Sequence, residues 1–187
     1  MTKIVLIGFN RCGTRSFHTM FRQNNIRSAH HLSGKLGATV MQNIKGGRAV
    51  FDRIDAYTAY SDFSYFSGGA FHDVNMKFRH IANDNPDYYF ILNTRDKTDW
   101  MNSRQKVVEG GSKLQKSSQT CEEYLEMTSR RWDVHHRRVR KYFSQAPDLK
   151  FLEFNIDEAP MEALRTFLSD SYSIEHERFP MRPKPEL

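Results

Sequence analysis

Apolar and polar residues alternate along this chain in two regular ways. Two apolar runs rich in β-branched and aromatic residues, 3–7 (Lys-Ile-Val-Leu-Ile) and 88–94 (Tyr-Tyr-Phe-Ile-Leu-Asn-Thr), are typical of buried strands. Weaker signals predict short strands at 26–31, 49–57 and 149–154. Segments with apolar residues at helical spacing predict helices at 17–24, 34–45, 74–82, 96–110, 121–144 and 161–168. The alternation predicts an α/β fold with a central, mainly parallel sheet flanked by helices.

The segment 121–144 carries a single apolar stripe. Its residues at 125, 132, 136, 139 and 143 are separated by seven, four, three and four positions, which places them on one helix face. His136 belongs to this stripe, so we interpret it as a hydrogen-bonded histidine at the edge of the core rather than as a ligand. Most of the basic residues of this segment are expected to be solvated: Arg130, Arg131, Arg137, Arg138, Arg140 and Lys141.

Two further segments have distinctive compositions. Residues 62–71 are aromatic and contain two glycines, which predicts a loop that either lines a substrate pocket, acts as a lid, or packs on the surface. Residues 171–187 are proline-rich and predict an extended tail. With 187 residues, we expect one domain, 1–187, with a core at about 3–170.

The composition is that of an ordinary globular protein, with 39% hydrophobic and 27% charged residues. No apolar run is long enough to cross a membrane, and the chain begins directly with a predicted strand, so neither a membrane partner nor a signal peptide is expected. The two cysteines, Cys12 and Cys121, have no pairing or metal-binding pattern. This cysteine usage suggests a reducing compartment and a cytoplasmic location.

The formal net charge of +6 admits two kinds of partner. Basic proteins bind nucleic acids, and they also bind small molecules that carry several acidic groups. The charge therefore does not decide between these partners.

Residues 8–16, Gly-Phe-Asn-Arg-Cys-Gly-Thr-Arg-Ser, connect the first strand to the first helix. A glycine-containing turn at such a junction is the layout of a phosphate-binding loop, because backbone N–H groups and the positive end of the helix dipole converge there. The hydroxyl groups of Thr14 and Ser16 can donate further hydrogen bonds. An ordinary turn without a ligand has the same outline, and Cys12 is interpreted as a space-filling residue rather than a nucleophile.

The order Arg-x-Gly-Thr after a first strand resembles the loop of the sulfotransferases, many of which carry Lys at the position of Arg11. In that family the loop holds the 5′-phosphosulfate of 3′-phosphoadenosine 5′-phosphosulfate (PAPS). The resemblance implies a three-layer P-loop fold and PAPS as the sulfuryl donor. It also implies that the donor-binding residues are Asn10, Arg11, Cys12, Gly13, Thr14, Arg15 and Ser16.

A second junction strengthens the resemblance. Sulfotransferases have an arginine after a strand and a serine eight residues later, and both hold the 3′-phosphate of the donor; Arg95 and Ser103 have this separation. Residues 90–96 followed by a tryptophan, and residues 132–143 with their His-His pair, also resemble a soluble subgroup of the family. The resemblance spans about residues 3–156.

The resemblance implies transfer of a sulfuryl group to a hydroxyl or amine of an acceptor. Like phosphoryl transfer, this reaction needs positioning and charge stabilisation more than covalent help. We assign to Arg11 the neutralisation of the bridging oxygen and the sulfonate as the bond breaks. No metal is expected, since the chain lacks a clear acidic magnesium site and Asp96 fits a helix cap better.

A general base must accept the proton of the acceptor. The candidates are Asp55, Asp62, His72 and Asp73, and Asp62 is the first choice because the string from Asp55 to Asp62 resembles the acidic stretch of the subgroup. The sequence beyond it departs from the family pattern, with Ser64 where a proline often stands. His72 and Asp73 therefore stay open as bases, and each of the four can have a purely structural role.

Three other functions are compatible with parts of the sequence. A P-loop nucleoside or nucleotide kinase would need Lys directly after Gly13, where Thr14 stands. A nucleic-acid-binding domain could use the basic residues 130–141, but the aromatic residues form no stacking platform, so no nucleic-acid partner is expected. A relative that binds the donor without catalysis is the third. The expected partners are the nucleotide donor and a small-molecule or carbohydrate acceptor.

Overall fold

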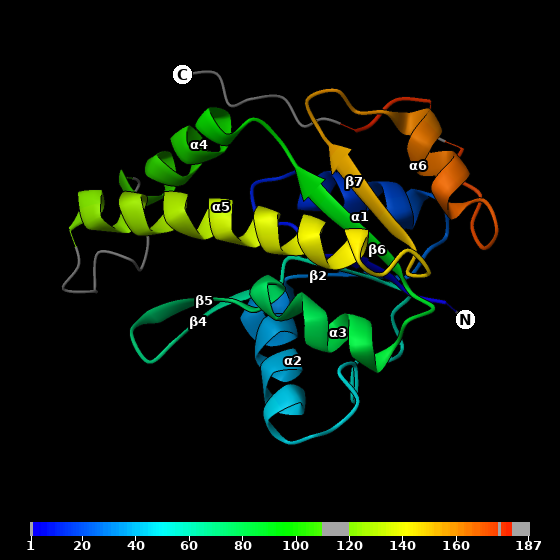
Figure 1. The fold of residues 1–187 in the computed structure, drawn as a ribbon, viewed down its shortest axis with the longest axis horizontal. Helices are drawn as coiled ribbons and strands as arrows, with labels where there is room; N and C mark the ends of the chain where they lie inside the picture. Colours follow the sequence, from blue (N-terminus) through cyan, green and yellow to red (C-terminus); the bar gives the residue numbers. More distant parts are fainter. Residues whose placement is uncertain (1, 110–119, 176, 181–187) are drawn as a thin grey trace.

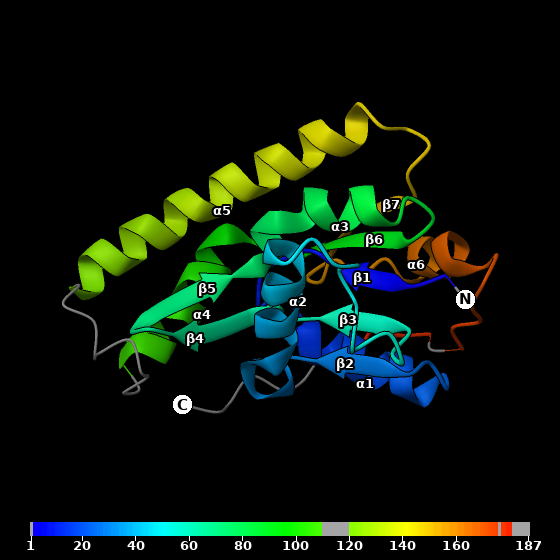
Figure 2. The same cartoon turned by 90° about the horizontal axis from the view of Figure 1, so that it is seen from below.

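The computed structural model describes residues 2–109, 120–175 and 177–180. Its centre is a sheet in which the five strands lie in the order β2–β3–β1–β6–β7 and every neighbouring pair is parallel. Figure 2 shows strands of this sheet stacked one above another. The strands are β1 (Ile4–Leu6), β2 (Ser28–His30), β3 (Ala59–Ser61), β6 (Tyr89–Thr94) and β7 (Phe151–Asn155).

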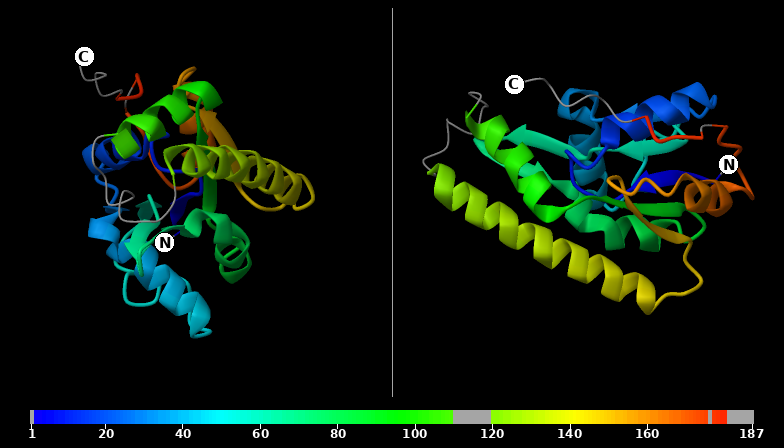
Figure 3. Two further views of the ribbon diagram at one scale, coloured as in Figure 1. Left: turned by 90° about the vertical axis from the view of Figure 1, so that its left-hand side faces the viewer. Right: turned by 90° about the horizontal axis from the view of Figure 1, so that it is seen from above.

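Helices cover both faces of the sheet (Figure 1). One layer contains α1 (Thr14–Gln23) and α6 (Met161–Leu168). The opposite layer contains α2 (Lys35–Lys45), α3 (Phe78–Asp84) and the long α5 (Cys121–Ser144), which runs along one side of the molecule (Figure 3). The remaining helical segments are η1 (Leu32–Gly34), η2 (Val74–Lys77) and α4 (Lys97–Glu109).

Alternate residues of the central strands supply the two cores. In β1 and β6, Ile4, Leu6 and Ile91 point to the layer of α1 and α6, whereas Val5 and Phe90 point to the layer of α2, α3 and α5. Because both faces are covered, these strands read as continuous apolar runs in the sequence. The predicted α/β fold with a parallel sheet between two helical layers is therefore confirmed.

The strand predicted at 49–57 is wrong, because these residues form turns and the strand beside β1 is β3, at Ala59–Ser61. The cause is a buried side chain of α2. The amide of Asn43 donates to the carbonyl oxygens of Val50 (3.0 Å) and Asp52 (2.8 Å), which satisfies backbone groups that a strand would pair in a ladder.

The loop predicted at 62–71 is instead an antiparallel hairpin of β4 (Ser64–Ser67) and β5 (Ala70–Asp73), separate from the main sheet. Gly68 and Gly69 form its turn with φ of 58° and 76°, a two-residue connection that favours glycine. The Gly-Gly pair between aromatic residues was the available hairpin signal.

The start of the first helix differs from its prediction, whereas the long helix at 121–144 agrees with it. The first helix begins at Thr14 rather than at residue 17, because Gly13 adopts the left-handed conformation that precedes it. The helix at 121–144 is confirmed at both ends, and His136 is buried in its stripe. Its Nδ1 lies 2.9 Å from the carbonyl oxygen of Trp132, and its Nε2 lies 3.0 Å from Oγ1 of Thr94.

The C-terminal segment reaches back to the beginning of the chain. Ile174 and Phe179 are buried, and the ring of Phe179 lies 4.8 Å from that of Phe17 and 5.2 Å from that of Phe154. Residues 172–175 and 177–180 form neither helix nor strand. The rest of the predicted tail, 176 and 181–187, lies outside the described residues.

Candidate active site

A single buried side chain holds both ends of the loop that follows β1. Asn93, in β6, accepts a hydrogen bond from the N–H of Gly8 at Oδ1 (2.9 Å), and its Nδ2 donates to the carbonyl oxygen of Cys12 (2.8 Å). A Cβ atom at Gly8 would lie only 1.9 Å from the carbonyl oxygen of Asn93. Gly8 is therefore required for β1, the loop and β6 to approach this closely.

Other side chains hold further carbonyl groups of the loop. Nε1 of Trp100, in α4, donates to the carbonyl oxygen of Asn10 (2.9 Å), and the amide of Asn75, in η2, donates to that of Gly8. In a trans peptide the C=O of one residue and the N–H of the next point in opposite directions. Because these carbonyl groups face the protein, the N–H groups that follow them face the other side of the loop.

The end of the loop has the geometry of an anion-binding turn. Arg11 and Gly13 have φ of 67° and 70°, and left-handed residues in such a turn can direct successive N–H groups toward one point. Helix α1 begins directly afterwards without a side-chain cap and without an acidic residue in its first turn. Its first N–H groups and the positive end of its dipole are therefore available to an anion.

The predicted loop residues divide into two groups. Thr14 and Ser16 are buried in the first turn of α1, and Arg15 is exposed. Cys12 is fully buried beside Phe9 and Trp100, and burial raises the pKa of its thiol. Its side chain is thus a filler, and Cys12 can contact a ligand on the other side of the loop only through its backbone.

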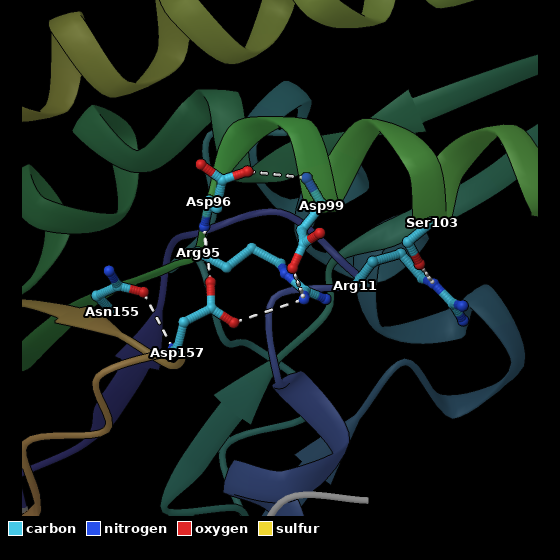
Figure 4. A network of polar contacts seen from close by, with 7 residues as sticks. All are labelled: Arg11, Arg95, Asp96, Asp99, Ser103, Asn155 and Asp157. Atoms are coloured by element: carbon cyan, nitrogen blue, oxygen red, sulfur yellow. Dashed lines mark hydrogen bonds and ion pairs between the residues drawn. The ribbon is translucent and has the colours of Figure 1, made fainter. Parts of the chain in front are cut away.

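Arg95 follows β6 and is held by acidic residues from two elements (Figure 4). Its Nη2 lies 3.2 Å from Oδ2 of Asp99 and 3.5 Å from Oδ1 of Asp157, which follows β7. The second oxygen of Asp157 accepts the N–H of Asp96 (2.8 Å), and Asp96 caps α4 by accepting the N–H of Asp99 (3.0 Å). The cap predicted for Asp96 is present.

One donor group of Arg95 lacks a partner. Its side chain is 14% exposed, and the Nε atom is buried with no hydrogen-bond acceptor in the described part of the chain. A buried donor without an acceptor costs about 1–3 kcal/mol. An anionic ligand at this position would remove that cost, so Arg95 fits the side of an anion site.

The structure brings Ser103 to Arg11. Nε of Arg11 donates to Oγ of Ser103 at 2.8 Å, which links the loop to the second turn of α4 (Figure 4). The pKa of Arg11 is lowered by burial and by the nearby charges of Arg15, Arg104 and Arg95, whereas Asp62 raises it. Four guanidinium groups therefore gather around one loop, an arrangement that favours a multiply charged anion.

Arg104 is a member of this group that the sequence analysis missed. Its Nη1 donates to Oδ1 of Asn10 (2.7 Å), its Nη2 donates to the hydroxyl of Tyr124, and its guanidinium lies 4.9 Å from the ring centre of Phe71. It is 5% exposed. Asp157 was also missed, although its position directly after a strand of the parallel sheet was a usable signal.

The four candidate bases lie in three places. Asp55 lies at the far end of β1, because its carbonyl oxygen accepts a hydrogen bond from Nζ of Lys3 (2.7 Å) and Lys3 precedes that strand. Asp62 directly follows β3, at the same edge of the sheet as the loop, and its Oδ1 accepts from N (3.3 Å) and Oγ (2.5 Å) of Ser64. His72 stacks on Tyr65 across the hairpin at 4.7 Å.

Asp73, at the end of the hairpin, has a raised pKa. Burial raises its pKa to about 6, and the positive charges of Arg104 and Arg131 oppose that rise. Asp62 raises it further. The hairpin thus carries two of the candidate bases, and Asp73 lies within electrostatic reach of both Asp62 and the arginine group around the loop.

Metal ligands and membrane spans were sought in the part of the chain that the structure describes. No group of three or more His, Cys, Asp or Glu side chains there is arranged to hold a metal ion. No helix of that part is long and apolar enough to span a membrane.

The comparison with protein families agrees with this geometry. The family model for the sulfotransferase domain matches residues 3–164, a range that includes the whole central sheet, the loop, Arg95 and Asp157. The chain therefore belongs to the sulfotransferase domain family, which is a family of transferases. No curated protein matches the chain.

Proposed function

We propose that this chain transfers a sulfuryl group from PAPS to a hydroxyl or amine of an acceptor. The observation that carries the proposal is the pair of anion positions at the ends of the neighbouring parallel strands β1 and β6. One position is the loop with its inward-facing carbonyl groups, and the other is Arg95 with its unpaired Nε. PAPS carries its phosphosulfate at the 5′ position and a further phosphate at the 3′ position.

The proposal assigns the 5′-phosphosulfate to the loop and to the first turn of α1. Backbone N–H groups of residues 10–16 and the side chain of Arg11 would hold it, as in other phosphate-binding loops. Arg95 and Ser103 would hold the 3′-phosphate. The carboxylates of Asp99 and Asp157 engage Nη2 of Arg95, so Nε and Nη1 of the guanidinium are assigned to the ligand.

The chemical step follows from these assignments. The acceptor oxygen or nitrogen forms a bond to sulfur while the bond from sulfur to the bridging oxygen breaks. The electron pair stays on that oxygen, so adenosine 3′,5′-bisphosphate leaves with an additional negative charge. Arg11 neutralises this charge as it develops, which stabilises the transition state more than the ground state.

Asp62 is the base that the proposal prefers. Its charge acts on Arg11, and Ser64 engages its Oδ1, so Oδ2 is assigned to accept the proton of the acceptor. The hydrogen bonds from Ser64 orient the carboxylate for this role. His72 and Asp73, on the neighbouring hairpin, are the alternatives.

Thermal unfolding with added nucleotides tests this function. At a concentration of about a hundred times its Kd, a ligand adds about 2.7 kcal/mol to the free energy of unfolding. Adenosine 3′,5′-bisphosphate should therefore raise the Tm of the wild type clearly more than ATP with Mg²⁺ does. A larger effect of ATP with Mg²⁺ would favour a P-loop kinase and contradict the proposal. A response to neither nucleotide would contradict donor binding altogether.

A further inference from the structure

A cavity of about 330 Å³ lies beside the hairpin, between β5, the segment η2–α3 and helix α5. Its volume is at the lower end of the range of small-molecule sites, about 300–1,000 Å³. Met41, Phe71 and Met76 provide apolar lining. The cavity is therefore suited to a small ligand with an apolar body.

The charged side chains that line the cavity are mostly positive. Four permanently cationic side chains contribute to it, against the single carboxyl group of Asp73; the four are Lys77, Arg79, Arg131 and Arg138. Arg79 lies over the ring of Tyr142, with 5.4 Å between its Cζ and the ring centre. Within the described part of the chain, no ion pair engages any of the four. Their positive charge is thus available to a ligand.

The cavity and the donor loop share their structural neighbours. Phe71, in the cavity wall, contacts Arg104, which in turn donates to Asn10 of the loop. Met76, also in the wall, packs against the cluster of Phe9 and Trp100 behind the loop. The cavity is therefore separated from the loop by these side chains, and Asp73 in its lining lies within electrostatic reach of Asp62 and Arg104.

We propose that this cavity holds the acidic end of the acceptor, and that the acceptor is an apolar small molecule with a carboxylate besides the hydroxyl that is sulfated. Arg131 and Arg138 lie seven residues apart on α5 and so share one helix face. They bind the carboxylate, and the apolar side chains of the wall contact the body of the molecule. This inference rests on the proposed function, because it names the acceptor of that reaction.

The test uses 4-hydroxyphenylalkanoates of increasing chain length, each paired with its primary amide as a neutral molecule of nearly the same size. For each pair, kcat/KM for sulfation with PAPS is measured, and binding of the carboxylate is measured by calorimetry. We expect at least one carboxylate to be preferred over its amide by about tenfold or more, as for loss of a charge-assisted contact.

Matched variants decide whether the cavity causes this preference. Arg131→Ala and Arg138→Ala should each reduce the preference for the carboxylate by about tenfold. Arg130→Ala and Arg137→Ala are the controls, since these exposed neighbours on α5 do not line the cavity but remove the same charge. The controls should retain the preference.

The possible results separate this inference from the proposed function. Equal use of the carboxylates and amides, an unchanged preference in Arg131→Ala, or no binding of any carboxylate at millimolar concentration would overturn the inference. In each of these cases a normal Tm increase with adenosine 3′,5′-bisphosphate would still support the proposed donor site. Absence of that Tm increase would overturn the proposed function itself.

Discussion

Asp157 holds the guanidinium group of Arg95 and the first turn of α4 at the same time. Its Oδ1 lies 3.5 Å from Nη2 of Arg95, and its Oδ2 accepts the N–H of Asp96 at 2.8 Å. Asp157 follows β7, and Arg95 follows β6, so the contact joins the ends of two neighbouring strands. We infer that Asp157 is a positioning residue for the proposed 3′-phosphate site.

Replacement of Asp157 by asparagine tests this role. Arg95 and Asp96 contact two different oxygens of Asp157, and an asparagine would place its NH₂ group against one of these two donors. We expect Asp157→Asn to weaken binding of adenosine 3′,5′-bisphosphate about tenfold and to leave binding of AMP, which lacks the 3′-phosphate, nearly unchanged. Asp99→Asn is the comparison, because the carboxylate of Asp99 also contacts Arg95 (3.2 Å) but, in the described part of the chain, accepts no backbone N–H of α4, so its effect on bisphosphate binding should be smaller. Tighter binding by Asp157→Asn would show that the carboxylate competes with the phosphate.

Arg11 is predicted to act on the chemical step. Its Nε is bound to Ser103, and it lies at the turn where the bridging oxygen would develop charge. Arg11→Ala should lower kcat about 10²–10³-fold with a much smaller change in the Kd of adenosine 3′,5′-bisphosphate. Arg11→Lys should retain most of the activity. The measurements are steady-state kinetics and calorimetry, with Arg22→Ala, an exposed arginine of α1, as the control. An equal loss in kcat and binding would contradict a role specific to the transition state.

The close approach of Gly8 to Asn93 predicts a large effect on stability. A Cβ atom at Gly8 would lie 1.9 Å from a backbone oxygen, whereas a Cβ atom at Gly68, in the hairpin turn, meets nothing within 4 Å. Gly8→Ala should lower the free energy of unfolding by about 3 kcal/mol or more. Gly68→Ala should cost about 1 kcal/mol, the strain of its positive φ. Urea unfolding measures both, and similar losses in the two variants would contradict the packing that the structure shows.

Asp73 gives a prediction about pH. Its pKa is raised from 3.8 to about 6 in the folded chain, mainly by burial, so the folded chain binds this proton more tightly than the unfolded chain. Its contribution to stability is present below about pH 4 and is lost as the pH rises to about 6. Asp73→Asn removes this titration. The free energy of unfolding of the variant, relative to that of the wild type, should therefore rise by about 2 kcal/mol between pH 4 and pH 7.

Urea unfolding of both proteins across this range measures the difference, and the difference cancels the titration of groups that they share. Asp87→Asn, at an exposed position, is the control and should run parallel to the wild type. A difference between Asp73→Asn and the wild type that stays constant with pH would contradict a raised pKa for Asp73.

Much of the fold could be predicted because its central strands are covered on both faces. All three residues of β1 and the first four of β6 are apolar or aromatic and buried, which leaves a clear run in the sequence. The bounds of helix α5 were predicted correctly from its apolar stripe, and the capping box of Thr120 and Glu123 was a further local signal for its start. The proposed phosphate-binding loop and Arg95 could be singled out for a similar reason, because each directly follows a strong strand.

The elements that were missed depend on contacts between distant residues. The segment 49–57 has strand-like residues, but Asn43 of α2 binds its carbonyl groups and prevents pairing. Arg104 looks like any polar residue of α4, and only the packing of Phe71, Tyr124 and Asn10 makes it part of the site. Nothing in the local sequence encodes these contacts.

The most direct test of the donor site compares two ligands on two proteins. Binding of adenosine 3′,5′-bisphosphate and of AMP is measured by calorimetry with the wild type and with Arg95→Ala. The donor site predicts that the wild type binds the bisphosphate at least about tenfold more tightly than AMP, and that Arg95→Ala loses most of this difference. Equal binding of the two ligands by the wild type, or an undiminished preference in Arg95→Ala, would contradict a 3′-phosphate site at Arg95.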